Sequence, residues 1–152
     1  TFDDRFEEVI GQCAASRSRD EAGTWITDDM RRAYIELHRL GYAHSVEVLM
    51  DRELAGGLYG VAIGRVFCGE SMFHLRPNAS KIALYHLVER LKEWEFPLID
   101  CQVTNDHLLS LGAEEMGRKE FLEMLRRNVG LPGHIGPWRQ ANSPGRGSGG
   151  GA

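Results

Sequence analysis

A carboxylate and an amide lie two positions apart in a hexapeptide that is otherwise mostly apolar, Leu98-Ile-Asp-Cys-Gln-Val103. The segment follows Pro97 and is predicted to be a strand, in which successive side chains point to opposite faces. Asp100 and Gln102 are therefore expected to share one face. A carboxylate accepts hydrogen bonds from an amine, and an amide both donates and accepts, so the pair suits the orientation of an amine nucleophile. The alternative interpretation is a strand end whose polar side faces water.

A second carboxylate lies in Cys68-Gly-Glu-Ser-Met-Phe73. The same alternation predicts that Cys68, Glu70 and Met72 share a face. An acid among apolar neighbours is costly to bury unless it has a partner. Two interpretations stay open: a paired structural carboxylate, or a pocket that binds a cationic group beside an apolar slot.

Two aromatic residues could bind a ligand, whereas the motifs typical of metal and nucleotide sites are missing from residues 1–129. Trp25 lies in a predicted loop and Tyr34 on an apolar helix face; each suits either ligand stacking or core packing. The six histidines and three cysteines show no metal-ligand spacing, so no metal is expected. The Gly-x-Gly-x-x-Gly pattern occurs only at 145–150, in the Gly-rich tail and not between a predicted strand and helix, and no glycine-rich pyrophosphate loop stands before residue 79, which argues against coenzyme A.

The elements that must position these residues follow from apolar spacing and turn residues. Helices are predicted over 3–15 and 27–40, with Thr27 as N-cap, and over 79–94, with Asn78 as cap and Ile82, Ala83, Leu87 and Leu91 facing inward. Strands are predicted over 44–50, 53–61, 65–73 and 98–103, a turn or short helix near 105–111, and a last helix around 121–129.

This order predicts an α+β fold, with a mixed sheet that includes an antiparallel meander and with helices on both faces. It resembles the core order of acyltransferases with the N-acetyltransferase-like fold, in which two strands splay apart and the acyl donor lies between them. Such a resemblance of folds implies no particular substrate.

Composition narrows the class of protein. The chain has 152 residues, of which 42% are hydrophobic and 26% charged, as in an ordinary globular domain. No membrane span or leader is expected, and the odd, widely spaced cysteines favour the reducing cytoplasm. Residues 1–129 carry a net charge of −6, which argues against an autonomous grip on nucleic-acid phosphates. Residues 130–152 are rich in Gly and Pro and are expected to be a tail, without ordered structure beyond about residue 138, whereas 1–129 form the catalytic domain.

Several stretches together resemble the bacterial leucyl/phenylalanyl-tRNA–protein transferases, in the same order and spacing over about residues 1–128. They are Gly23-Thr-Trp-Ile-Thr27, His44-Ser-Val-Glu47, Gly56-Gly-Leu-Tyr-Gly-Val61, Phe67-Cys-Gly-Glu-Ser-Met-Phe73, Asn78-Ala-Ser-Lys81, Leu98-Ile-Asp-Cys-Gln-Val103 and His107-Leu-Leu-Ser-Leu-Gly-Ala113. The resemblance implies an enzyme that transfers Leu, Phe or Met from aminoacyl-tRNA to an N-terminal Arg or Lys, in the N-degron pathway. It also implies a monomer that works in the cytoplasm without cofactor.

The resemblance further implies roles for individual residues. Asp100 and Gln102 would be the catalytic pair, Trp25 and Tyr34 would engage the terminal adenosine, and Glu70 would position the aminoacyl group. The apolar side chain would be bound by Leu58, Phe67, Met72, Leu84 and Ile99. Two alternatives remain: a non-catalytic domain that binds aminoacyl-tRNA or N-terminal peptides, and an N-acyltransferase that uses another acyl donor.

Overall fold

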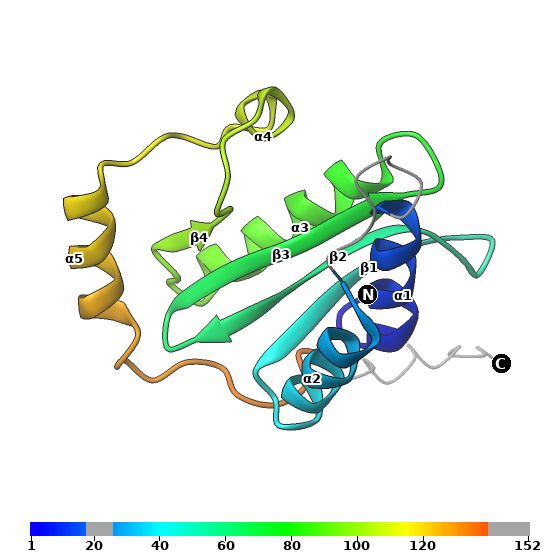
Figure 1. The fold of residues 1–152 in the computed structure, drawn as a ribbon, viewed down its shortest axis with the longest axis horizontal. Helices are drawn as coiled ribbons and strands as arrows, with labels where there is room; N and C mark the ends of the chain where they lie inside the picture. Colours follow the sequence, from blue (N-terminus) through cyan, green and yellow to red (C-terminus); the bar gives the residue numbers. More distant parts are fainter. Residues whose placement is uncertain (18–25, 140–152) are drawn as a thin grey trace, which may run out of the picture.

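The structure is a computed structural model that describes residues 1–17 and 26–139. Its elements run in the order expected from the sequence (Figure 1). They are α1 (Phe6–Arg17), α2 (Asp28–Arg39), β1 (Ala43–Met50), β2 (Glu53–Ile63), β3 (Val66–His74), α3 (Ala79–Glu93), β4 (Leu98–Asp100), α4 (Asp106–Ser110) and α5 (Arg118–Asn128).

The sheet has the order β1-β2-β3-β4. The first three strands form the expected antiparallel meander, and β4 joins β3 in parallel. The β1–β2 turn is made by Asp51 and Arg52, whose φ angles are 52° and 69°. The β2–β3 turn uses Gly64 at φ 57°, where a Cβ atom would collide with the carbonyl oxygens of Asn128 and Val129. The end of α5 is thereby fixed against this turn.

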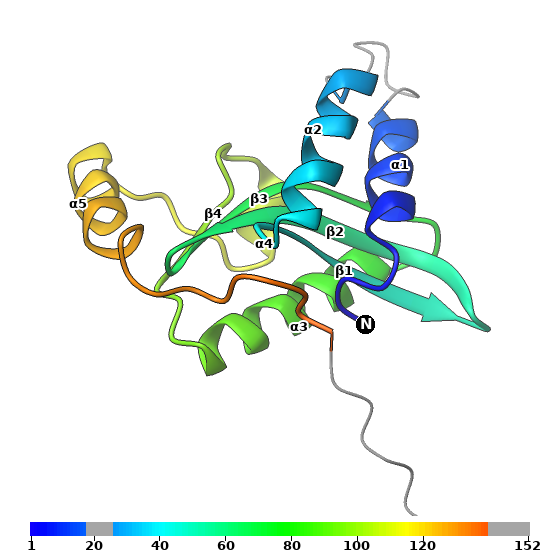
Figure 2. The same ribbon diagram turned by 90° about the horizontal axis from the view of Figure 1, so that it is seen from below.

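Helices cover both faces of the sheet, as the sequence predicts (Figure 2). On one face α1 and α2 pack over a core cluster that includes Val9, Ile10 and Tyr59. On the other face α3 buries Ala83, Leu87 and Leu91. Among the described residues, no helix combines the length and the apolar character needed to cross a membrane.

Helix starts agree with the sequence in one case and differ in another. The Thr27 side chain accepts a hydrogen bond from the Met30 amide at 3.3 Å, so this N-cap is confirmed. Asn78 occupies the N-cap position of α3 in a left-handed conformation, φ 65°, but its side chain makes no capping bond.

The expected inward position of Ile82 in α3 is wrong. This side chain is 45% exposed, because the buried face of the helix is formed by Ala83 and Leu87.

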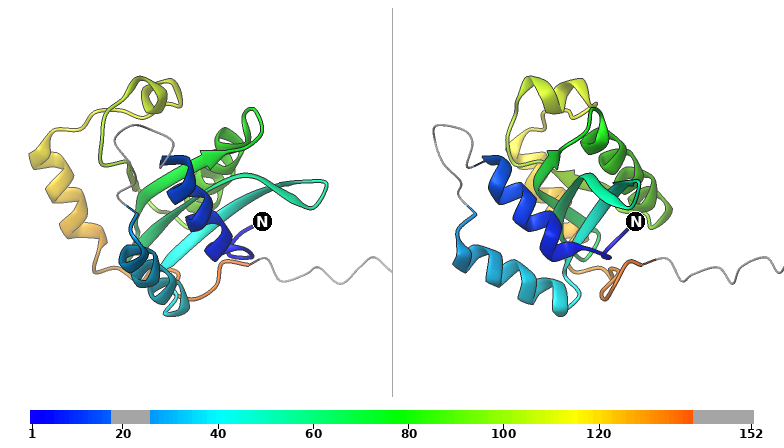
Figure 3. Two further views of the ribbon diagram at one scale, coloured as in Figure 1. Left: turned by 45° about the vertical axis from the view of Figure 1, so that its right-hand side comes forward. Right: turned by 90° about the vertical axis from the view of Figure 1, so that its right-hand side faces the viewer.

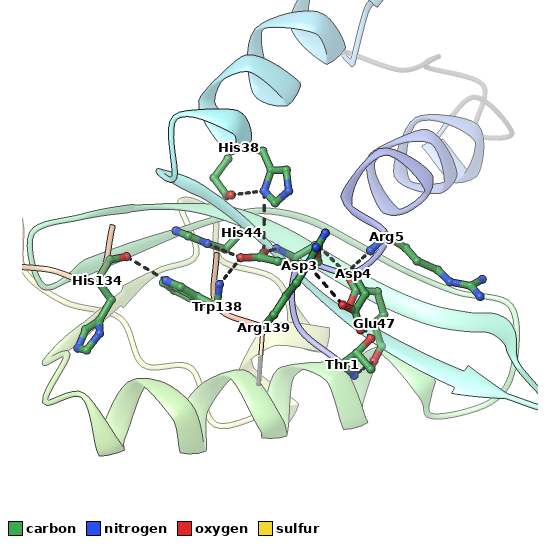
Figure 4. Close-up of polar contacts among 12 residues, drawn as sticks. Thr1, Asp3, Asp4, Arg5, His38, His44, Glu47, His134, Trp138 and Arg139 are labelled. Atoms are coloured by element: carbon green, nitrogen blue, oxygen red, sulfur yellow. Dashed lines mark hydrogen bonds and ion pairs between the residues drawn. The ribbon is translucent and has the colours of Figure 1, made fainter. Parts of the chain in front are cut away.

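Residues 130–139 pack against the fold instead of forming a loose tail. Trp138 is buried, stacks on His44 at 3.7 Å, and donates its backbone N–H to the Asp3 carboxylate at 2.7 Å (Figure 4). Arg139 also donates to the Asp3 carbonyl oxygen at 2.9 Å. The expected boundary at residue 129 therefore falls too early for the packed part of the chain. Residues 140–152 lie outside the described residues.

Candidate active site

The site begins where β4 stops. β4 pairs with β3 only through Val66–Leu98, Phe67–Ile99 and Cys68–Asp100. The predicted strand over 98–103 is therefore too long: β4 ends at Asp100, where the chain turns away from β3. From Gly69 onward, β3 has no paired strand on this side within the described residues. The open edge leaves room for a cavity between β3 and the 101–108 segment.

A tight turn, and not a shared strand face, brings Asp100 and Gln102 together. Gln102 has φ 66°, which is incompatible with a continuing strand. Its backbone N–H donates to Oδ1 of Asp100 at 2.8 Å, an arrangement typical of Asx turns. Asp100 is half-buried and Gln102 exposed. The expected proximity of the two residues is thus found, although the expected reason for it is wrong.

Glu70 lies at a bulge in β3. In the pairing with β2, Tyr59 is opposite Ser71 and Gly60 is opposite Gly69, so Glu70 is the extra residue. A bulge interrupts the alternation of faces and redirects a side chain. The simple two-residue alternation used for the sequence therefore does not extend across Glu70.

Glu70 connects two of the predicted site residues. Gln102 Nε2 donates to Glu70 Oε1 at 3.3 Å. The pKa of Tyr34 is raised well above its ordinary value, first by burial and then by the interaction of its hydroxyl with the Glu70 carboxylate. The Tyr34 ring is held edge-on to Tyr59, with 5.2 Å between the ring centroids. Side chains from α2, β3 and the segment after β4 thus form one polar chain.

The predicted apolar residues assemble around one cavity of about 300 Å³. Its lining includes all five of them, Leu58, Phe67, Met72, Leu84 and Ile99, together with Glu70 and Gln102. These residues come from β2, β3, α3 and β4, so the sheet and α3 both shape the cavity. An apolar hollow with a few polar groups at its wall is the usual form of a small-ligand site.

A larger cavity of about 800 Å³ lies next to the first. It is bounded by the C-terminal half of α3, the 96–104 segment, and the chain from α4 to the start of α5. Asp100 lines this cavity only, whereas Gln102 lines both. Figure 3 shows the chain from α4 to α5 extending away from the sheet.

Two thiols lie beside the carboxylates. Burial raises the pKa of Cys68, and the charges of Asp100 and then Glu70 raise it further. Burial and the charge of Asp100 likewise raise the pKa of Cys101. Since the thiolate is the reactive form of cysteine, both residues are poor nucleophiles at neutral pH. The described residues also contain no group of His, Cys, Asp and Glu side chains that could hold a metal ion.

One predicted site residue lies outside the described part of the chain, and three residues at the site were not predicted from the sequence. Trp25 lies in the segment 18–25, which is not described, so its role stays a prediction. Conversely, Asn105, His107 and Leu108 line the smaller cavity and were not expected to do so. The short helix near these residues was predicted, but its position beside the cavity depends on tertiary structure that a local pattern does not contain.

Solved structures share this fold. A probable acetyltransferase superposes with a TM-score of 0.60 at 11% identity, covering 77% of this chain and 90% of that chain. An aminoglycoside acetyltransferase from an uncultured soil metagenomic sample gives 0.51 at 12% identity, covering 73% of this chain and 87% of that chain. These similarities confirm the acetyltransferase-like fold, and at this identity they concern the fold alone.

Proteins related to this chain by sequence have a much higher identity to it than these solved structures do. The leucyl/phenylalanyl-tRNA–protein transferase of Pseudoalteromonas atlantica is 59% identical over 132 residues, which cover 87% of this chain and 56% of the relative. That of Maridesulfovibrio salexigens is 54% identical over 140 residues, covering 91% and 58%. The chain thus spans little more than half the length of these relatives. Residues 1–126 also match the family described as leucyl/phenylalanyl-tRNA protein transferase, and the chain belongs to that family.

Proposed function

We propose that the chain transfers Leu, Phe or Met from an aminoacyl-tRNA to the N-terminal Arg or Lys of an acceptor protein. Family membership supports this activity. The observation that carries it is the cavity of about 300 Å³, in which five apolar side chains surround a space beside Glu70 and Gln102. Such a cavity fits one apolar amino-acid side chain with its polar backbone atoms toward the wall. Discrimination between side chains that differ by one methyl group should amount to only about 1–3 kcal/mol.

In this proposal the polar chain orients the donor. Glu70 interacts with the aminoacyl group, while Gln102 donates a hydrogen bond to the Glu70 carboxylate and Tyr34 lies close enough to interact with it. Trp25 and Tyr34 would contact the terminal adenosine, as the resemblance implies. Fixing a reactant in the productive orientation contributes much of the rate enhancement when the chemistry itself is favourable.

The reaction exchanges an ester for an amide. The acceptor's α-amino nitrogen attacks the ester carbonyl carbon and a C–N bond forms. The C–O bond to the tRNA ribose breaks, and the proton lost by nitrogen ends on the released ribose hydroxyl. Asp100 holds the incoming amine. Its Oδ1 accepts a hydrogen bond from the backbone N–H of Gln102, whereas its Oδ2 makes no hydrogen bond with any described residue and is the oxygen that accepts from the amine. No cofactor takes part in these steps.

The remaining parts of the proposal follow from the resemblance. The enzyme acts as a monomer in the cytoplasm, and its product carries a destabilising N-terminus for the N-degron pathway. The net charge of −6 over residues 1–129 indicates that this part of the chain supplies little of the attraction to tRNA phosphates.

The test is transfer of labelled Phe from charged tRNA to a protein that begins with Arg. The same protein with an acetylated N-terminus is the control, because it lacks the attacking amine. We expect label on the Arg protein only. Binding of the charged tRNA without transfer would favour a non-catalytic binding domain, and labelling from acetyl-coenzyme A would favour another acyl donor; either result contradicts the proposal.

A further inference from the structure

The smaller cavity has a buried apolar floor and an exposed rim. Leu58 and Phe67 at the floor are 3% and 0% exposed, whereas Asn105 and His107, which line the same cavity, are exposed. In an aminoacyl ester the carbonyl carbon stands between the amino-acid side chain and the ribose oxygen. A donor whose side chain fills the apolar floor therefore places its ester bond toward the rim, on the side of Asn105 and His107.

The backbone that carries His107 is held by the hydrogen bonds of α4. The Asn105 side chain accepts a hydrogen bond from the Leu108 N–H at 2.8 Å, and Ser110 Oγ donates to the His107 carbonyl oxygen at 2.7 Å. The His107 imidazole itself makes no hydrogen bond or ion pair with a described residue. The ring nitrogens are thus available to a bound donor, on a backbone that is already ordered.

Among the described side chains that line the smaller cavity, His107 is the only histidine. The other titratable groups on this wall are Tyr59, Glu70 and Cys101. Tyr59 is fully buried, and Glu70 already accepts a hydrogen bond from Gln102. Burial raises the pKa of the Cys101 thiol, which therefore releases its proton less readily. The imidazole is the side chain of this set that both takes up and releases a proton near neutral pH.

Asp100 and His107 line different cavities. Asp100 lines only the larger cavity and His107 only the smaller one, whereas Gln102 and Leu108 line both. When an amine displaces an alcohol from an ester, one proton leaves the attacking nitrogen and one reaches the departing oxygen. Because these two atoms are bonded to the same carbon in different directions, an acid and a base on separate sides of that carbon suit the exchange.

We propose that His107 is a catalytic residue that donates a proton to the ribose oxygen as the ester bond breaks. This inference rests on the proposed function and adds a residue to it. The C–N bond forms and the nitrogen loses a proton to the Asp100 carboxylate, while the C–O bond breaks and the ribose oxygen takes a ring N–H proton from the imidazolium of His107. Since His107 is exposed and Asp100 only half-buried, one proton returns from Asp100 to His107 through water, and no other acid or base is consumed.

The first test is the single-turnover rate of Phe transfer from charged tRNA to an Arg-initiated protein. His107→Gln keeps a polar side chain but removes the acidic ring N–H, and we expect it to slow transfer by about 100-fold. His86→Gln is the matched control, because His86 is exposed on α3 and lines neither cavity; it should transfer at the wild-type rate. Equal rates for the wild type and His107→Gln would overturn the inference and leave the proposed function standing, whereas no transfer by the wild type would overturn both.

A donor with a better leaving group separates proton donation from positioning of the donor. Charged tRNAs that end in 2′-fluoro-2′-deoxyadenosine or in 2′-deoxyadenosine both lack the 2′ hydroxyl, but the fluorine makes the neighbouring 3′ oxygen less basic and a better leaving group. The loss of rate in His107→Gln should therefore be about tenfold smaller with the fluorinated donor. An equal loss with both donors would show that His107 only positions the donor, against the inference.

The pH dependence provides an independent check. The ratio of the wild-type rate to the His107→Gln rate should fall as the pH rises from about 6 to about 8, because imidazole loses the proton that it would donate. Ionisation of the acceptor amine cancels in this ratio. The titratable groups around His107 are the same in both proteins: Tyr59, Glu70 and Cys101 on the cavity wall and Asp106 beside it in α4. A ratio that stays constant over this range would contradict proton donation by His107.

Discussion

At the scale of single residues, the charge of Asp100 acts on more than the proposed amine. It contributes to the raised pKa of both Cys68 and Cys101, after burial in each case. The carboxylate therefore lies near two thiols, one on β3 and one in the segment after β4. The reactivity of Cys68 and Cys101 therefore reports whether the Asp100 carboxylate lies close to both thiols.

The substitution Asp100→Asn should make both thiols react faster. Removing the negative charge lowers their pKa, so more thiolate is present at pH 8 and alkylation by iodoacetamide accelerates. We expect an increase of about twofold to tenfold, the range that a change of up to one pKa unit produces. Peptide mass spectrometry gives the rate at each cysteine.

Asp106→Asn is the control for this measurement, since Asp106 is exposed in α4 and does not contribute to either thiol pKa. Cys13 is fully buried and reports any loss of structure. Unchanged rates at Cys68 and Cys101 in Asp100→Asn, with Cys13 still protected, would show that the carboxylate points elsewhere.

At the scale of elements, local patterns predict much of the fold. The meander, the Thr27 cap and the short helix after Asn105 all follow from alternation, turn residues and capping residues, which act within a few positions. The length of β4 and the bulge at Glu70 were not predicted, because both depend on pairing with β3. Sequence spacing thus located Asp100 and Gln102 but not the turn that joins them.

The β1–β2 turn allows a test of backbone conformation. Arg52 has φ 69°, a conformation that costs a residue with Cβ about 1–2 kcal/mol and glycine almost nothing. Arg52→Gly should therefore have a free energy of unfolding about 1 kcal/mol higher than Arg52→Ala, as measured by urea denaturation. The alanine variant removes the same side chain without relieving the backbone, so it is the matched control. Equal stabilities would contradict the turn conformation.

At the scale of the whole molecule, the first residues and the 130–139 segment meet on β1. The buried Asp3 carboxylate accepts hydrogen bonds from the backbone N–H groups of Ser45 at 2.9 Å and Trp138 at 2.7 Å, and contacts His44 Nδ1 at 2.9 Å (Figure 4). The high Gly and Pro content of the 130–139 segment gave no indication of these contacts. Burial of the Trp138 side chain stabilises the segment by more than the ordering of its flexible neighbours costs. Composition alone therefore did not reveal that residues 130–139 contact the fold.

Trp138→Ala tests whether the 130–139 segment belongs to the folded unit. Removing a buried Trp should lower the free energy of unfolding by about 3–5 kcal/mol. Ile135→Ala is the control from the same segment: Ile135 is 66% exposed, and its loss should change stability by less than about 0.5 kcal/mol. Urea denaturation followed by circular dichroism measures both, and a small effect of Trp138→Ala would place the segment outside the cooperative unit.

The central claim is that the Asp100 carboxylate, which lines the larger of the two cavities, holds the attacking amine. Its most direct test is the single-turnover rate of Phe transfer from charged tRNA to an Arg-initiated protein, in the wild type and in Asp100→Asn. The account predicts measurable transfer by the wild type and a rate at least about 100-fold lower in the variant, with the fold intact by circular dichroism. Transfer by Asp100→Asn at the wild-type rate would contradict it.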